Sequence, residues 1–540
     1  MAAPAPLRAA HRPRRRPAAF AVLAGLLLGL LAAPRPGTAA TKFEGYYSVY
    51  TLAEKVDRNW RVWMPSHYAE LKFLSHLSSN LEAFVKLRAN ASYDDDRTTF
   101  PEYMAPPWAT AEGHLKLRTQ HSETILFSRQ NHFWINDEPL FHLVDDWKLK
   151  NDNYGPQSQG IRYEFWDRRV PLLGTWGGTV IYSDDGGVYN WGDGDRAVGV
   201  DSWIVRLRNK AWGDRIWGGL MFLRKDWTDT SAPENRDRTQ WMHNSVVSAD
   251  IAFFPHDLAE TGLHLGPIDL EQSRLTLEAA WSSTPYREHV YGEPTDHSYL
   301  FGAEVRDIHV SDLILHAWYF DFGENFRDYL SGRFDDRREY NRVQKHVEGI
   351  WFVPRKAITA KVTYDHYRKR VADEVGGGLR PSTSWYGELY IEFIKGFKGK
   401  VAYSRWHGFD ASSEVNGFYT YPGWFAELSV ENFLAKIRLQ ARLKDAGTFR
   451  ELSAYGFDMN VNLTDRVKAY LRMLNVNENI EARNTMFAQL KYDLGFGAEI
   501  YFEYGDPGQS DNLVYTDWFV NEGNNDNLRD RIALSFRTWF

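Results

Sequence analysis

From residue 41 onward the chain repeatedly alternates apolar with polar or charged residues, and this pattern limits its possible folds more than any other feature. Between 81 and 92, Leu, Ala and Val occupy the odd positions, and mostly charged or polar residues occupy the even ones. The segment 435–444 repeats the scheme, with Lys, Arg and Gln at the even positions. Successive side chains of a strand point to opposite faces, so each segment predicts a strand with one apolar and one polar face.

Such strands fit a membrane barrel better than a soluble sandwich. A sandwich would place long rows of Lys and Arg in solvent, whereas a barrel needs one face for lipid and one for a wet lumen. No stretch after residue 40 approaches the roughly 18 uninterrupted apolar residues of a membrane helix. The mean hydropathy is −0.50, yet aromatic residues make up 15% of the chain, a heavy load for a soluble protein. We therefore predict an all-β fold, one large antiparallel transmembrane β-barrel over residues 41–540, without a second domain.

Residues 1–40 have the order of parts that a secretory signal peptide requires. They contain six arginines, no acidic residue, an apolar run from Ala18 to Ala33, and small residues from Thr38 to Ala40. The run is too short to cross a membrane as a folded helix, which disfavours a membrane anchor. We predict a signal peptide over 1–40, with cleavage near Ala40.

Short and long connections alternate between the predicted strands. Tight turns are expected near 307–311, 354–356, 396–399, 431–432, 462–465 and 493–497, and longer loops at 323–341, 368–383, 407–422, 475–484 and 505–527. Transmembrane barrels show this asymmetry, with short periplasmic turns and long extracellular loops. Continuing to the N-terminus gives about 24 strands, within a range of about 20–26. In the region hardest to assign, 51–63 fits a short helix, and 137–160 is either an outside loop or a segment folded into the pore.

Charge and cysteine content exclude several classes of function. Without the arginines of residues 1–40, the chain has 58 basic and 71 acidic residues, a formal net charge of −13, which argues against nucleic-acid binding. It has no cysteine, so disulfide scaffolds, thiolate metal sites and cysteine nucleophiles are excluded. A Gly-rich segment carries Asp184, Asp185, Asp193 and Asp195, but it lacks the bidentate Glu of a calcium loop and is better explained as a solvated loop. We expect no metal and no cofactor.

The last ten residues carry a family resemblance. In the segment 531–540, Ile532, Leu534, Phe536, Thr538 and the final Phe540 fall on one face of a strand. This resembles the C-terminal strand of bacterial outer-membrane porins and related barrels, although Thr538 stands where a large apolar residue is usual. The resemblance implies a bacterial outer-membrane location and reading of Phe536 and Phe540 by the barrel-assembly machinery.

Charged residues at alternate positions predict the lining of the pore. Lys or Arg on the lipid face costs about 2–4 kcal/mol at the bilayer midplane, so these rows should face inward. Pairing between neighbouring strands is the simpler expectation for them, and a net basic stretch through Arg438 and Arg442 that selects anions is the alternative. The predicted pore-lining residues are Lys86, Arg88, Lys116, Arg118, Arg206, Arg208, Glu278, Glu388, Glu392, Glu427, Lys436, Arg438, Arg442, Lys468, Arg472, Glu499 and Glu503.

These features predict an outer-membrane channel of the porin type, in contact with outer-membrane lipid, for small or polymeric solutes that include anions. The alternative is a scaffold or sheath that holds an exported partner in its bore, such as a polysaccharide-export or redox component. A TonB-dependent transporter is disfavoured because the strands begin soon after residue 40 and leave no room for a globular plug.

An enzyme is not expected, because the sequence contains no recognisable nucleophile motif. The pairs Glu388/Glu392 and Glu499/Glu503 lie four residues apart, or about 13 Å along a strand, which is too wide for either glycosidase geometry. The loop aromatics Tyr419, Tyr421, Trp424 and Trp518 suit stacking on sugars, but a girdle at the membrane interface is the favoured interpretation.

Overall fold

The computed structural model of the protein describes residues 41–540 apart from gaps that lie mostly between strands. The gaps are 57–58, 63–64, 92–107, 129, 131–134, 136–139, 145–158, 185–197, 230–239, 256–263, 285–295, 324–325, 327, 329, 331–341, 354–356, 370–380, 411–416, 449–450, 479–480 and 506–530. The predicted signal peptide lies outside the described residues.

The described residues form strands joined by turns and loops, and all 27 strands belong to one antiparallel sheet. The first fourteen are β1 (Thr41–Val56), β2 (Asn59–Val62), β3 (Ser66–His76), β4 (Leu81–Ala91), β5 (Trp108–Arg118), β6 (Ser122–Ser128), β7 (Gln159–Val170), β8 (Gly174–Asp184), β9 (Val198–Ala211), β10 (Ile216–Asp229), β11 (Gln240–Phe253), β12 (His264–Leu265), β13 (Ile268–Asp269) and β14 (Arg274–Thr284). The others are β15 (Asp296–Val310), β16 (Leu313–Phe322), β17 (Arg342–Val353), β18 (Ile358–Lys369), β19 (Ser382–Ile394), β20 (Phe397–Asp410), β21 (Gly417–Glu431), β22 (Ala435–Lys444), β23 (Leu452–Asn462), β24 (Val467–Glu478), β25 (Glu481–Gly495), β26 (Ala498–Tyr504) and β27 (Arg531–Trp539).

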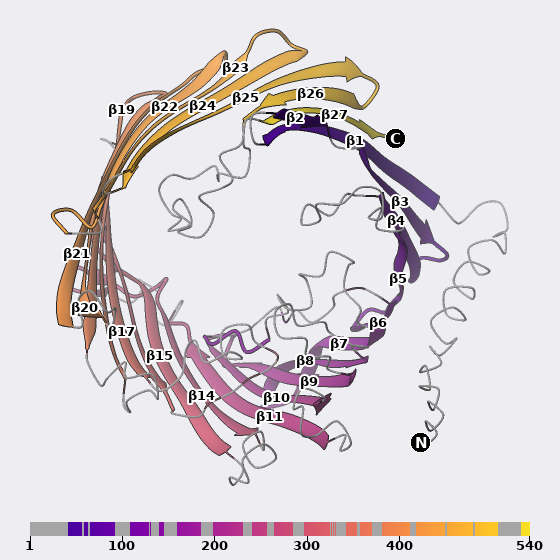
Figure 1. The fold of residues 1–540 in the computed structure, drawn as a ribbon. Helices are drawn as coiled ribbons and strands as arrows, with labels where there is room; N and C mark the ends of the chain where they lie inside the picture. The colour runs from indigo at the N-terminus through magenta and orange to yellow at the C-terminus, as the bar shows by residue number, and fades with distance from the viewer. Residues whose placement is uncertain are drawn as a thin grey trace, which may run out of the picture.

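The first and last strands close the sheet into a ring. β1 pairs with β3 along one edge and with β27 along the other, where Tyr46 lies opposite Trp539 and Glu54 opposite Arg531. Strands β2, β12 and β13 are only two to four residues long, and the other 24 form the closed wall (Figure 1). The predicted all-β barrel and its number of strands are confirmed.

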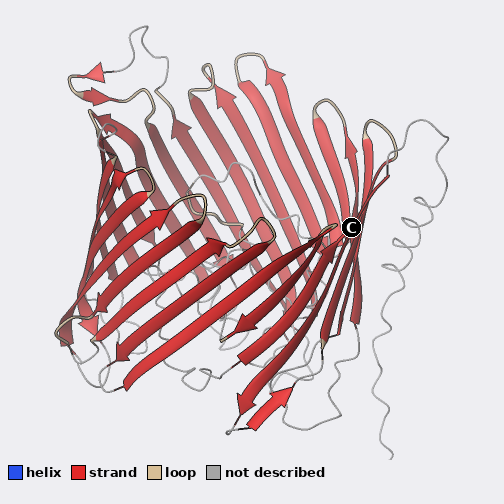
Figure 2. Cartoon of the chain, turned by 90° about the horizontal axis from the view of Figure 1, so that it is seen from above, coloured by secondary structure: helices blue, strands red, loops and turns tan. Residues whose placement is uncertain are grey.

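The short turns gather at one end of the barrel, as Figure 2 shows from the side. Five of the six predicted tight turns coincide with short connections between described strands, including the turn at 395–396 between β19 and β20, and the sixth, at 354–356, lies outside the described residues. Gly396 there has a φ of 83°, a left-handed conformation that glycine adopts without steric cost.

Three predictions of local structure are wrong, because pairing with a neighbouring strand overrides turn and helix preferences. The expected helix at 51–63 belongs to β1 and β2, where Thr51 pairs with Leu534 to close the barrel. The expected long loop at 475–484 is mostly strand, since Asn475 pairs with Asn484. In the expected loop at 407–422, β20 and β21 stay paired through Asp410 and Gly417.

The outer face of the wall is apolar around the ring. Large side chains at alternate positions are about half exposed, such as Trp281 at 57%, Val362 at 53% and Leu439 at 51%. In hydrocarbon every backbone polar group must be paired within the protein, and a closed barrel achieves this without a free edge. The protein is therefore an outer-membrane β-barrel. No helix in the described part of the chain is long and apolar enough to cross a membrane.

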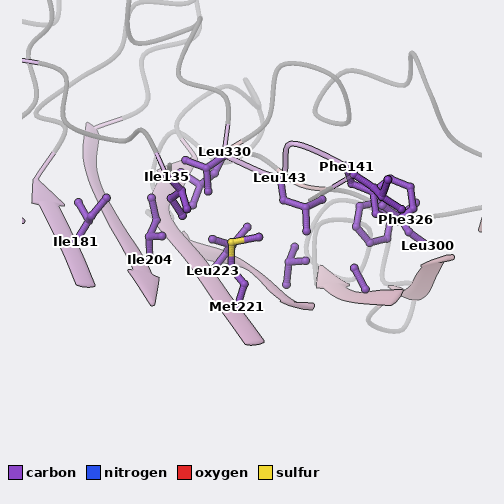
Figure 3. Packing of buried hydrophobic residues seen from close by; sticks show 14 of the residues in the cluster. Ile135, Phe141, Leu143, Ile181, Ile204, Met221, Leu223, Leu300, Phe326 and Leu330 are labelled. Carbon is purple, nitrogen blue, oxygen red and sulfur yellow. The ribbon is translucent and has the colours of Figure 1, made fainter. Parts of the chain in front are cut away.

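The inner face differs between two sides of the barrel. From β8 to β16 it presents buried apolar side chains, among them Ile181, Ile204, Leu223, Leu300 and Phe322. Two inward-lying segments cover this patch with the buried residues Leu140, Phe141, Leu143, Phe326 and Leu330 (Figures 1 and 3). The expectation that polar residues line the whole interior is therefore wrong on this side, because the chain's own loops shield the wall from water.

Candidate functional site

The candidate site is the lumen, and the predicted pore-lining residues all lie on its wall. Each occupies the strand face opposite to the half-exposed apolar side chains; Arg438, for example, is the neighbour of the outward Leu439. The structure brings most of them together with partners on adjacent strands, and these contacts divide into three groups around the ring.

The first group lies on β3 to β7, where basic residues meet acids that the sequence analysis did not single out. Lys86 Nζ lies 2.7 Å from Glu112, and Arg88 contacts both Glu112 at 3.0 Å and Glu70 at 3.3 Å. Two further predicted residues follow: Lys116 pairs with Glu123 at 3.4 Å, and the Arg118 guanidinium lies 5.7 Å from the centre of the Trp166 ring.

The second group lies on β7 to β11 and is more deeply buried. Arg206, whose side chain is 2% exposed, forms an ion pair with Asp250. Arg208 donates to Glu164 at 2.9 Å, and Arg162 donates to the same carboxylate at 2.7 Å. The guanidinium groups here face acids rather than open water, so this part of the wall holds charge without offering it to a solute.

Glu278 on β14 anchors one of the inward-lying segments. One of its carboxylate oxygens accepts hydrogen bonds from the backbone N–H groups of Leu140 and Phe141, each at 3.1 Å. The other oxygen accepts the Ser248 hydroxyl at 2.7 Å. The residue is 2% exposed, so this predicted pore-lining carboxylate holds a covering segment instead of facing the open lumen.

The third group lies on β19 to β26, where each predicted acid has a hydrogen-bond donor. Glu388 pairs with Lys400 at 2.8 Å, and Glu392 accepts the Gly396 N–H at 3.1 Å. The other contacts are Glu427 with Gln440 at 2.6 Å, Glu499 with Lys491 at 2.5 Å, and Glu503 with Gln489 at 2.7 Å.

Basic residues concentrate within this group. Arg438 donates to Asp458 at 2.7 Å, and Arg472 is the register partner of the same Asp458 on its other side. Among the described side chains, the inner face of β22 to β25 carries Lys436, Arg438, Arg442, Lys444, Lys468, Arg472 and Lys491, but only two acids, Asp458 and Asp493. Glu427 and Glu431 on β21 and Glu499 and Glu503 on β26 flank this surface, which we call the basic stripe.

Aromatic residues form a second feature of the same wall. Trp406 on β20 is the register partner of Tyr421 on β21, and their ring centres lie 5.6 Å apart in a stacked arrangement. Tyr419 continues the row at 5.0 Å from Tyr421. All three point into the lumen, so the girdle interpretation is wrong for the two tyrosines. It fits the outward Trp424, which is 51% exposed, while Trp518 lies outside the described residues.

The alternation of strands alone would have placed Trp406 inside, because the outward Val401 fixes the direction of β20. The Gly, Asn and Tyr residues between 407 and 422 predict a loop and obscure this alternation. The apolar inner patch also had a signal, since runs such as 220–223, Leu-Met-Phe-Leu, are apolar on both faces of the strand.

The described residues contain no group of three or more His, Asp or Glu side chains placed to hold a metal ion. Of the four aspartates in the Gly-rich segment, Asp184 ends β8 and accepts a hydrogen bond from Gln159 at 3.2 Å. The other three lie outside the described part of the chain.

No protein-family model matches the chain, and no curated protein matches it either. Solved structures similar to it include the siderophore receptor PirA from Pseudomonas aeruginosa, with 11% identity, a TM-score of 0.46, and coverage of 94% of this chain and 82% of that one. PirA from Acinetobacter baumannii gives 9% identity, a TM-score of 0.47 and coverage of 93% and 81%. The FrpB iron transporter from Neisseria meningitidis has 8% identity and a TM-score of 0.44, with coverage of 92% of this chain and 82% of that one.

Proposed function

We propose that the protein is an outer-membrane channel whose solutes pass along the polar side of the lumen. The observation that carries the proposal is the division of the interior. From β8 to β16 the wall presents buried apolar side chains and buried ion pairs beneath inward-lying segments, whereas from β17 through β27 to β5 it carries charged and hydroxyl side chains, several of them partly exposed. A solute that keeps part of its water shell favours the polar side, because desolvating polar groups is costly.

We further propose that this passage prefers anions. Seven basic and two acidic side chains on the described inner face of β22 to β25 give the basic stripe a net positive charge. Rings or rows of Lys and Arg favour anions in pores. The acids of β21 and β26 lie on separate strands, so the charges are segregated into stripes instead of alternating along each strand.

Conductance of the purified protein in planar bilayers tests both parts. We expect steady channels with a cation/anion permeability ratio below one, and replacement of Arg438 and Arg442 by Glu should raise that ratio. The matched control is Lys116→Glu, which changes lumen charge outside the stripe and should shift the ratio less. An unchanged ratio in the double variant would refute the anion preference. A sealed or unstable pore would refute the channel and favour a sheath that lacks its partner.

A further inference from the structure

A stacked pair of aromatic rings in the wall of the lumen requires an explanation that a membrane girdle cannot give. Girdle residues face lipid, but Trp406 and Tyr421 occupy inward positions, where packing against hydrocarbon is impossible. Both side chains are only half-buried, and neither belongs to the apolar clusters of the described interior. Their rings therefore present apolar area to the lumen.

Small residues adjoin Trp406 on its own strand and on the neighbouring strands. Gly408 lies beneath the Trp406 ring, since a Cβ there would lie 2.5 Å from a carbon of the indole. On β19, Ser384 is the register partner of Trp406. On β21, Gly423 is the register partner of Ser404, which lies two residues before Trp406. The indole consequently lies along the wall above Gly408, and Ser384 and Ser404 occupy adjoining positions on the same inner face.

Basic side chains adjoin the aromatic pair on the next strand. Lys444 on β22 is the register partner of Gly423, two residues from Tyr421, and Arg442 is the partner of Phe425. Diagonal neighbours on adjacent strands lie about 7–8 Å apart, within reach of long side chains. The end of the basic stripe that carries Lys444 and Arg442 therefore adjoins the aromatic pair.

From this juxtaposition we infer that Trp406 and Tyr421 form a binding site for sugar rings that carry carboxylates, as in an acidic oligosaccharide. The ring faces stack on the apolar faces of the sugar, serine hydroxyls at 384 and 404 bond its hydroxyl groups, and Lys444 and Arg442 attract its carboxylates. The inference rests on the proposed channel function and names the class of its solute.

The test measures binding and block with two probes of equal length, hexagalacturonate and neutral maltohexaose. Calorimetry on the purified full chain in detergent reports binding without requiring conduction, and the same sugars added to planar bilayers report block of the current. We expect hexagalacturonate to bind more tightly than maltohexaose. Trp406→Ala should weaken its binding by about tenfold or more, the equivalent of 1.4 kcal/mol.

Two further variants separate the parts of the site. Trp385→Ala removes an outward tryptophan of the neighbouring strand that is 48% exposed, and should leave the affinity for both sugars unchanged. Lys444→Gln should bring the affinity for hexagalacturonate closer to that for maltohexaose. Undiminished binding in Trp406→Ala, or no binding of either sugar to a conducting wild-type channel, would overturn the inference. Calorimetric binding without any conductance would instead overturn the channel and leave the site standing.

Discussion

Glu278 offers a direct way to loosen a segment inside the barrel without altering the backbone pairing of the wall. Replacement by Ala removes the acceptor of the Leu140 and Phe141 N–H groups and of the Ser248 hydroxyl. A buried donor left unpaired costs about 1–3 kcal/mol, so the two backbone donors together disfavour the docked segment by about 2–6 kcal/mol. The apolar contacts of Phe141 and Leu143, both fully buried, still favour it.

The equilibrium constant for docking should therefore fall by about one to four powers of ten, since each power of ten corresponds to about 1.4 kcal/mol. We expect Glu278→Ala channels to show larger or noisier conductance in planar bilayers, and chymotrypsin to cleave after Phe141 faster than in the wild type. Glu278→Gln is the matched control, because its amide oxygen accepts both N–H groups and its NH₂ group donates to the serine. This variant should behave like the wild type.

Two outcomes would contradict the reasoning. If Glu278→Ala conducts quietly and resists cleavage as the wild type does, apolar packing alone holds the segment. If Glu278→Gln is as loose as Glu278→Ala, the negative charge and not the hydrogen-bond geometry matters.

Three further predictions concern assembly, orientation and stability. Phe540, whose backbone pairs with Gly45 and whose ring lies against that glycine, should be needed for assembly: Phe540→Ala and Phe536→Ala should lower the yield of heat-modifiable barrel on gels, and normal yield would argue against an assembly signal. Because the chain has no cysteine, single substitutions test orientation: a water-soluble thiol reagent should label Arg442→Cys but not Leu439→Cys, and the reverse pattern would invert β22. Asp250→Ala leaves the buried Arg206 guanidinium without that partner and should cost about 3–5 kcal/mol, seen as a lower unfolding temperature, whereas an unchanged temperature would show that other groups compensate.

The sequence predicts the fold well wherever one strand face meets lipid and the other meets water. The segment 435–444 shows this, because its alternation alone gives the bounds of β22 and the inward direction of Arg438. The interior is harder to predict, since it depends on contacts between residues far apart in the chain. Glu278 looked like one more lumen carboxylate, and only the fold reveals that segment 140–144 lies across it.

The same limit explains why the aromatic row was misplaced. Gly, Asn and Tyr between 407 and 422 suggest a loop, and nothing local shows that β20 and β21 extend to Asp410 and Gly417. The extra residues of each strand are stabilised by pairing with the other strand. This effect is cooperative, and no single window of sequence contains both partners. Turn composition therefore underestimates strand length at the rim of a barrel, where paired strands extend into their own loops.

The covered apolar patch and the basic stripe depend on each other. A 24-strand ring encloses more space than side chains can fill, and a wall polar all round would leave a wide unselective bore. Apolar side chains on one side give the loop segments something to dock against, which costs less than docking on charges that would first lose water. The docked segments confine solutes to the remaining wall. If that wall sets selectivity, loosening the segments through Glu278→Ala should also weaken the anion preference, and an unchanged permeability ratio in a noisier channel would separate the two.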